Sequence, residues 1–300
     1  MITRRTVFVL GAGASRPFGF PTGVELYQRV VDGLVEGPDL DFLRTEAGYS
    51  VTELRAFRDA LFRSGKNSVD AFLEHRPEFL ELGKAAMARV LVICEAEDGL
   101  FRARDNWLRY AYDRLSASFE EFGENAISFV TFNYDRSVEH FIFTALKNTF
   151  GKSDDECKVL LEKIPIIHLH GRLGFLPWEK NGGRRYDQTI NLPVLRYCIQ
   201  NINIVSEDIT DRDKEFVTAR KLLREAEQIY FLGFGYALTN MQRLDIEHLG
   251  ASSRRIVGSG LGLTRREVAG IISAGKGAFS EDIDTTQDCL GFLRSVVEWA

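Results

Sequence analysis

A glycine turn with the composition of a phosphate-binding site follows the first apolar run of the chain, residues 7–10. Its residues are Gly11, Ala12, Gly13, Ala14 and Ser15, and Pro21 and Thr22 lie a few positions further on. Backbone amides at such a turn, with a helix N-terminus beyond it, are suited to bind an anion. The third glycine of the dinucleotide-binding fingerprint is absent, so the turn alone does not identify a nucleotide site.

An amide and an imidazole follow two later apolar runs. Asn133 lies within Thr-Phe-Asn-Tyr-Asp (131–135), and His170 lies within His-Leu-His-Gly (168–171). Asn133 is an uncharged donor and acceptor that is suited to position a water or a sugar hydroxyl. His170, with an ordinary pKa of about 6.5, is suited to act as a general base at neutral pH. His168 alternates with His170 along the strand, so we expect it on the opposite face, in a structural role.

Further glycine and polar clusters end the remaining apolar runs. Their residues are Gly171, Gly233, Phe234, Gly235, Tyr236, Gly258 and Ser259. The carboxyl ends of parallel strands meet at one edge of a sheet, so we expect all these clusters to face one crevice. Each cluster alone also fits a purely structural turn, and Tyr236 is expected as a wall of the crevice rather than an acid.

The elements that must position these residues are five strands separated by helical patterns. Strand-like runs occur at 7–10, 127–132, 164–169, 229–234 and 255–258, and most lack polar alternation. We therefore predict an α/β fold with a Rossmann-like, mostly parallel sheet. More than a hundred residues separate the first two runs, which is far more than a crossover needs. We predict a catalytic core of 1–34 and 126–300 with a helical insertion at 35–125, and Arg184 and Arg185 on a solvated loop.

Composition excludes several classes of function. The 300 residues carry a net charge of −5, which does not favour a nucleic-acid or membrane surface. The apolar run after Arg4 and Arg5 is too short for a signal peptide, so a cytoplasmic location is expected. Cys94, Cys157, Cys198 and Cys289 are scattered singly, and the five histidines lack ligand spacing, so no metal is predicted.

In order and spacing these motifs resemble the sirtuin-like superfamily, specifically its bacterial branch of NAD⁺-consuming domains. The resemblance covers about 1–30 and 125–300, and Asp288 and Cys289 look like the adenine-side end of the family's site. Two features depart from the deacylating members. The chain lacks their four-cysteine zinc module, and it has Pro-Thr-Gly-Val at 21–24 where they have Pro-Asp-Phe-Arg. Both departures favour hydrolysis of NAD⁺ over protein deacetylation.

The resemblance implies an NAD⁺ glycohydrolase that releases nicotinamide and ADP-ribose, with Asn133 and His170 catalytic. Asp135 would bind the nicotinamide amide or brace the Asn133 loop, or simply cap the next helix. Such an enzyme would deplete NAD⁺ in anti-phage defence, regulated by the insertion, by a homo-oligomer, or by a partner ATPase or sensor. The alternatives are a deacylase or ADP-ribosyltransferase, and a non-catalytic module that senses NAD⁺ or ADP-ribose.

Overall fold

The chain forms one parallel sheet of five strands in the order β3-β2-β1-β4-β5. The computed structural model describes residues 1–115, 117–204, 213–250 and 254–299. The strands are β1 (Thr6–Leu10), β2 (Ile127–Thr131), β3 (Ile166–His168), β4 (Gln228–Leu232) and β5 (Arg255–Gly258). The predicted α/β class and parallel sheet are confirmed. The second, third and fourth strands end one or two residues earlier than predicted, because the polar clusters already belong to the turns that follow.

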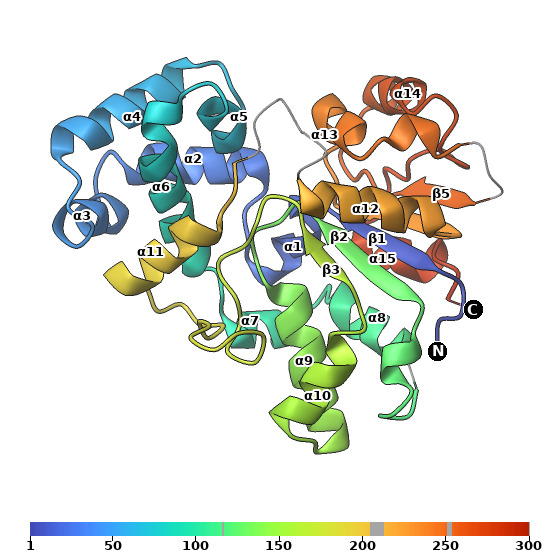
Figure 1. The fold of residues 1–300 in the computed structure, drawn as a ribbon. Helices are drawn as coiled ribbons and strands as arrows, with labels where there is room; N and C mark the ends of the chain where they lie inside the picture. The colour runs from blue at the N-terminus through green and yellow to red at the C-terminus, as the bar shows by residue number, and fades with distance from the viewer. Residues whose placement is uncertain (116, 205–212, 251–253, 300) are drawn as a thin grey trace.

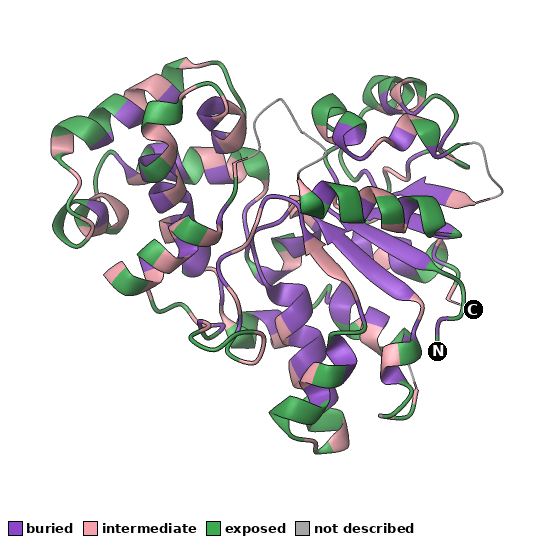
Figure 2. Cartoon of the chain, viewed as in Figure 1, coloured by how far each residue is buried: buried purple, intermediate pink, exposed green. Residues whose placement is uncertain are grey.

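Helices cover both faces of the sheet, which explains why its strands are apolar on both sides. Val7 and Val9 of β1 face α12 (Lys214–Glu225), α13 (Leu238–Arg243) and α14 (Arg265–Ala274). Phe8 and Leu10 face the opposite layer, formed by α8 (Trp107–Arg114), α9 (Ser137–Phe150) and α15 (Cys289–Ser295). Figure 1 shows the two layers on either side of the strands, and Figure 2 shows that the central strands are buried.

Most of the chain between β1 and β2 is helical. After α1 (Ala12–Ser15) come α2 (Gly23–Gly33), α3 (Pro38–Thr45), α4 (Val51–Arg63), α5 (Val69–Leu73), α6 (Leu80–Val92), α7 (Glu97–Arg102) and α8. Several begin where the sequence offers a cap: Ser50 accepts a hydrogen bond from the Glu53 amide, and Ser68 accepts one from the Ala71 amide.

These helices pack in two groups. Helices α2, α3, α4 and α5 gather around α6, and so does α11 (Leu192–Asn201), which follows β3 in the chain. By contrast, α8 packs on α9 and α15 beside the sheet. α10 (Asp154–Leu161) lies against α9. The division at 35 and 125 therefore stays a prediction. Short 3₁₀ turns complete the fold at Arg16–Phe18, Pro77–Phe79, Phe122–Glu124 and Ile246–His248.

A buried ion cluster connects the end of α6 to the loop after β3. Glu95, after α6, is fully buried and pairs with both Arg136 and Arg184. Arg136 Nε donates to Glu95 Oε1 at 2.9 Å. The prediction that Arg184 lies on a solvated loop is wrong, whereas Arg185 is exposed. The Arg184 amide bonds back to the Phe175 carbonyl at 2.8 Å, and its guanidinium meets the buried Glu95 carboxylate.

Candidate functional site

A cavity of about 360 Å³ lies where the carboxyl ends of β1, β2, β3 and β4 meet. Each of these strands contributes at least one wall residue from the turn that follows it. The predicted site residues that line the cavity are Gly11, Ala12, Ser15, Pro21, Asn133, Asp135, His170, Phe234 and Gly235. The two predicted catalytic residues therefore share one cavity with the first glycine turn.

The side chain of Asn133 is held by a chain of hydrogen bonds. Its Nδ2 donates to the Gly11 carbonyl at 3.0 Å and to Ser15 Oγ at 2.9 Å. Ser15 Oγ in turn donates to Asp135 Oδ2 at 2.6 Å. Since a carbonyl oxygen can only accept, these contacts fix which end of the amide is the donor. No described residue donates to Asn133 Oδ1, so this acceptor remains for a ligand in the cavity.

Asp135 makes the contacts of a bracing residue. Its Oδ2 accepts from Ser15, and its Oδ1 accepts from the Ser137 amide at 3.1 Å, near the start of α9. Burial raises the pKa of Asp135, and the hydrogen bonds from Ser137 and Ser15 partly offset that rise. Of the three roles considered from sequence, these contacts fit bracing of the Asn133 loop and capping near the start of α9. Binding of the nicotinamide amide stays a prediction.

His170 is buried and has an unused ring nitrogen. Its side chain lies among Phe132, Tyr134 and Phe216, with ring centroids 5.6, 6.3 and 6.4 Å away. No described residue bonds to its Nδ1. Burial lowers the pKa of His170, the charge of Asp70 raises it and that of Arg243 lowers it further. The imidazole is therefore neutral at neutral pH, the form that can accept a proton.

The glycines of the first turn serve close packing of β1 against the end of β4. A Cβ on Gly11 would lie 2.6 Å from the Gly233 carbonyl oxygen, and one on Gly13 would lie 2.8 Å from Gly233 Cα. The Gly11 and Gly13 amides donate to the carbonyls of Leu232 and Gly233 at 3.0 and 2.9 Å. These two amides are occupied by β4. The expectation that the backbone amides of this turn are available to an anion is therefore wrong for Gly11 and Gly13.

The other predicted binding residues do not line this cavity. They are Gly13, Ala14, Thr22, Gly171, Gly233, Tyr236, Gly258, Ser259, Asp288 and Cys289. Tyr236 and Ser259 lie behind the Gly233 turn: the Tyr236 hydroxyl donates to the Ser259 carbonyl at 3.0 Å, and the Gly233 amide donates to Ser259 Oγ at 3.0 Å. Asp288 caps α15 by accepting from the Gly291 amide at 2.7 Å. Their part in binding stays a prediction.

His168 supports Asn133 from the other side of the strand. Its Nδ1 lies 3.0 Å from the Asn133 carbonyl and its Nε2 lies 2.5 Å from Glu139 Oε1 in α9. Burial alone would raise the pKa of Glu139, but His168 and Arg172 outweigh it and lower the value to about 2. Both ring nitrogens of His168 therefore contact acceptors, one in the Asn133 loop and one in α9.

Two walls of the cavity were not predicted from the sequence. Ser68, Asp70, Ala71 and Glu74 come from α5 and its ends, and Thr239, Asn240 and Arg243 come from α13. Arg243 joins the two walls by pairing with Glu74 at 3.1 Å, and the Tyr134 hydroxyl donates to Asp70 Oδ1. Of the residues in these contacts, only Tyr134 belongs to a motif that the sequence singled out.

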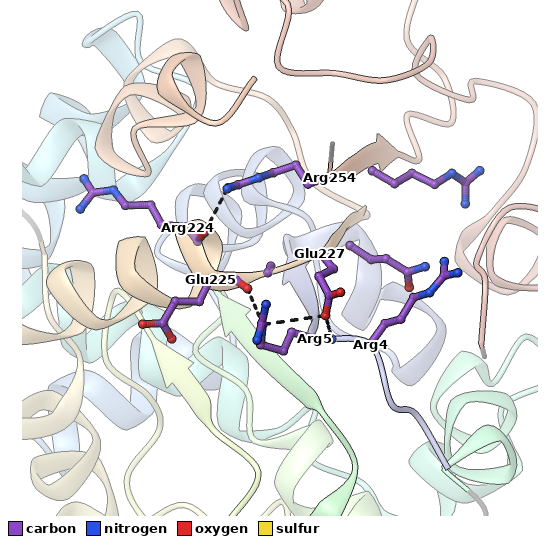
Figure 3. Close-up of a pocket in the computed structure, with 9 residues that line it drawn as sticks. Arg4, Arg5, Arg224, Glu225, Glu227 and Arg254 are labelled. Carbon is purple, nitrogen blue, oxygen red and sulfur yellow. Dashed lines mark hydrogen bonds and ion pairs between the residues drawn. The ribbon is translucent and has the colours of Figure 1, made fainter. Parts of the chain in front are cut away.

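A second cavity, of about 670 Å³, lies at the amino ends of the strands and is rich in arginine. Figure 3 shows Arg5 beside Glu225 and Glu227, and Arg254 beside the end of α12. Arg4 pairs with Glu298 at 3.0 Å, Arg224 with Asp245 at 3.0 Å, and Arg255 with Glu281 at 2.8 Å. Because these three arginines are paired with carboxylates, they are less available to a ligand than the unpaired polar atoms of the first cavity.

Neither a metal centre nor a membrane span is found among the described residues. No group of three His, Cys, Asp or Glu side chains is placed there to hold a metal ion, and the four cysteines are free thiols. Within the same residues, no helix has the length and apolar character needed to cross a bilayer.

Comparison with known proteins gives a distant similarity of fold. No protein-family model and no curated protein matches the chain. Among solved structures, it is similar to "Structure of Sir2Tm bound to a propionylated peptide", with a TM-score of 0.41 and 16% identity over 98% of this chain and 92% of that chain. A similarity at this level assigns neither a family nor an activity.

Proposed function

We propose that this chain is an NAD⁺ glycohydrolase that releases nicotinamide and ADP-ribose. The observation that carries the proposal is the meeting of Asn133 and a buried, neutral His170 in one cavity beside the Gly11 turn. The order of the sequence motifs supports NAD⁺ as the substrate. The cavity, about 360 Å³, is near the small end of the range for ligand sites, roughly 300–1,000 Å³. It therefore suits the nicotinamide riboside end better than a whole dinucleotide.

The reaction needs a base and a positioning group, but no strong acid. The bond between ribose C1′ and the nicotinamide nitrogen breaks, and its electron pair leaves with the nicotinamide, which becomes neutral. The ribose carries oxocarbenium-like positive charge until a water oxygen bonds to C1′. His170 accepts the proton of that water, and Asn133 Oδ1 accepts a hydrogen bond from the water or a ribose hydroxyl.

Hydrolysis is favoured over transfer to a protein because of the two departures from the deacylating sirtuins in the sequence. The chain lacks their four-cysteine zinc module, and it has Pro-Thr-Gly-Val at 21–24 where they have Pro-Asp-Phe-Arg. A deacylase or ADP-ribosyltransferase remains the second candidate.

We further propose that the chain acts as a regulated, NAD⁺-depleting effector in bacterial anti-phage defence. This step rests on the motif resemblance alone. Constant hydrolysis of NAD⁺ would be lethal, so the activity requires control by the helical region, by a homo-oligomer, or by a partner ATPase or sensor.

The test is to incubate the purified chain with NAD⁺ and resolve the products by chromatography, with and without an acetylated peptide. Hydrolysis predicts equal amounts of nicotinamide and ADP-ribose that do not depend on the peptide. Release that requires the peptide, with loss of its acetyl group, identifies a deacylase. Attachment of ADP-ribose to an added protein identifies a transferase, and binding of NAD⁺ without release of nicotinamide identifies a sensor.

A further inference from the structure

Asp70 is a carboxylate of the cavity wall that has no cationic partner among the described residues. Asp70, in α5, accepts a hydrogen bond from the neutral Tyr134 hydroxyl and another from Ser68 Oγ at 3.4 Å. No ion pair to Asp70 occurs within the described part of the chain. The other acidic residue of this wall, Glu74, pairs with Arg243 at 3.1 Å. The charge of Glu74 is therefore balanced, whereas that of Asp70 is not.

Asp70 lies close to the predicted catalytic residues although it is distant in sequence. Tyr134, its hydrogen-bond partner, directly follows Asn133, and the Tyr134 ring centroid lies 6.3 Å from that of His170. Asp70, Tyr134, Asn133 and His170 all line the same cavity. A negative charge on Asp70 consequently acts on the space in which a ligand would meet His170.

We propose that Asp70 is a catalytic residue that stabilises the positive charge developing on the ribose. The inference rests on the proposed function. As the C1′–nitrogen bond breaks, the ribose becomes cationic, and a fixed carboxylate in a partly buried site lowers the energy of that state. Asp70 forms no covalent bond: the electron pair of the broken bond goes to nicotinamide, and the proton of the attacking water goes to His170.

A purely structural role for Asp70 makes different predictions. In that role its carboxylate only anchors α5 to Tyr134, so losing either partner would have the same effect. Asp70→Asn keeps an oxygen that accepts from Tyr134 but removes the charge. Tyr134→Phe removes the hydrogen bond but keeps the charge. The two variants therefore separate the charge of Asp70 from its anchoring contact.

The experiment measures kcat and KM for NAD⁺ in the wild type, Asp70→Asn, Tyr134→Phe and the surface control Asp98→Asn. We expect Asp70→Asn to lower kcat by about 100-fold or more with little change in KM, as for loss of other electrostatic contacts to a transition state. Tyr134→Phe should lower kcat by less than roughly a tenth of that factor. Asp98, 81% exposed in a surface ion pair, should have no effect.

The pH dependence supplies a second readout, which tests whether the charge of Asp70 acts on the space beside His170. The charge of Asp70 raises the pKa of His170, against burial and Arg243, which both lower it. Asp70→Asn should therefore move the acid limb of the kcat/KM profile, and the NMR titration of His170, to lower pH. Equal kcat in wild type and Asp70→Asn, equal losses in Asp70→Asn and Tyr134→Phe, or an unmoved His170 titration would each overturn the role of Asp70. A wild type that releases no nicotinamide overturns the proposed function and this role together.

Discussion

The Ser15 hydroxyl accepts a hydrogen bond from Asn133 Nδ2 at 2.9 Å, across 118 positions of sequence. The same oxygen donates to Asp135 at 2.6 Å. Ser15 thus connects the turn after β1 to the turn after β2, and it helps to orient Asn133 so that Oδ1 is left for a ligand.

Replacing Ser15 should therefore damage catalysis more than folding. Ser15→Ala leaves the buried Asp135 Oδ2 without its donor, which costs about 1–3 kcal/mol. It also removes one of the two acceptors that hold Asn133 Nδ2, and a misplaced reacting group lowers kcat by up to roughly 100-fold. Steady-state kinetics and urea unfolding measure the two effects.

Ser137→Ala is the matched control for that variant. Ser137 is also buried beside Asp135, but its hydroxyl contacts Tyr186 at 3.0 Å, and its backbone amide keeps the bond to Asp135. We expect a loss of stability with kcat retained. If Ser15→Ala and Ser137→Ala have the same kcat, the orienting role of Ser15 is wrong.

A methyl group at Gly13 should destabilise the fold. Its Cβ would lie 2.8 Å from Gly233 Cα and 2.9 Å from the Gly233 carbonyl oxygen, both backbone atoms that cannot move independently. Overpacking of this kind costs about 1–3 kcal/mol or more. Gly270→Ala, within α14 with open space around it, should instead stabilise by roughly 0.5–1 kcal/mol. Thermal or urea unfolding that ranks the two variants the other way would contradict the close packing of β1 on β4.

The Glu95 cluster should make a large contribution to stability. Glu95→Gln leaves the buried Arg136 and Arg184 without their carboxylate, and breaking a buried pair costs about 3–5 kcal/mol. Asp98→Asn, in an exposed pair with Arg102, should change the free energy of unfolding by less than about 0.5 kcal/mol. Similar urea midpoints for the two variants would show that the cluster contributes little.

Acidification below neutrality should destabilise the chain through His140. Burial and the charge of Arg136 lower the pKa of His140 to about 4, although Glu139 opposes them. Between about 6.5 and 4 the unfolded state binds the extra proton, so stability falls as pH falls, by on the order of 3 kcal/mol in all.

His140→Phe tests that pH dependence. It keeps a ring to stack on Tyr186, where the centroids are 4.4 Å apart, but it cannot be protonated. The free energy of unfolding of the variant should vary less between pH 7 and pH 4 than that of the wild type. An unchanged slope would exclude His140 as the source.

The sheet could be predicted from sequence because each strand is a short apolar run that ends in a glycine or polar cluster. Strands covered on both faces leave that signal without knowledge of their partners. Gly11, Asn133 and His170 could be predicted to lie close together, because parallel strands end at one edge of the sheet. The bonds of the Gly11 and Gly13 amides to β4 could not be predicted, because they depend on how closely two turns approach each other.

The remaining walls of the cavity left no local signal. Asp70 lies in a short helix and Glu74 at its end, more than forty positions from any of the predicted motifs, and only the packing of α5 places them beside His170. The burial of Arg184 likewise left no local signal in the sequence. A double arginine after two glycines is typical of an exposed loop, and its buried partner, Glu95, is 89 positions away.

The most direct test of the proposed hydrolysis is the turnover and binding of NAD⁺ by Asn133→Ala and His170→Ala. We predict that each variant loses about 10²–10⁴-fold in nicotinamide release, the usual contribution of a general base. Binding of NAD⁺, measured by calorimetry, should remain largely intact in both, and His168→Ala should lower stability more than turnover. Near wild-type hydrolysis by His170→Ala, with loss of hydrolysis in a folded His168→Ala, would contradict this assignment of the catalytic residues.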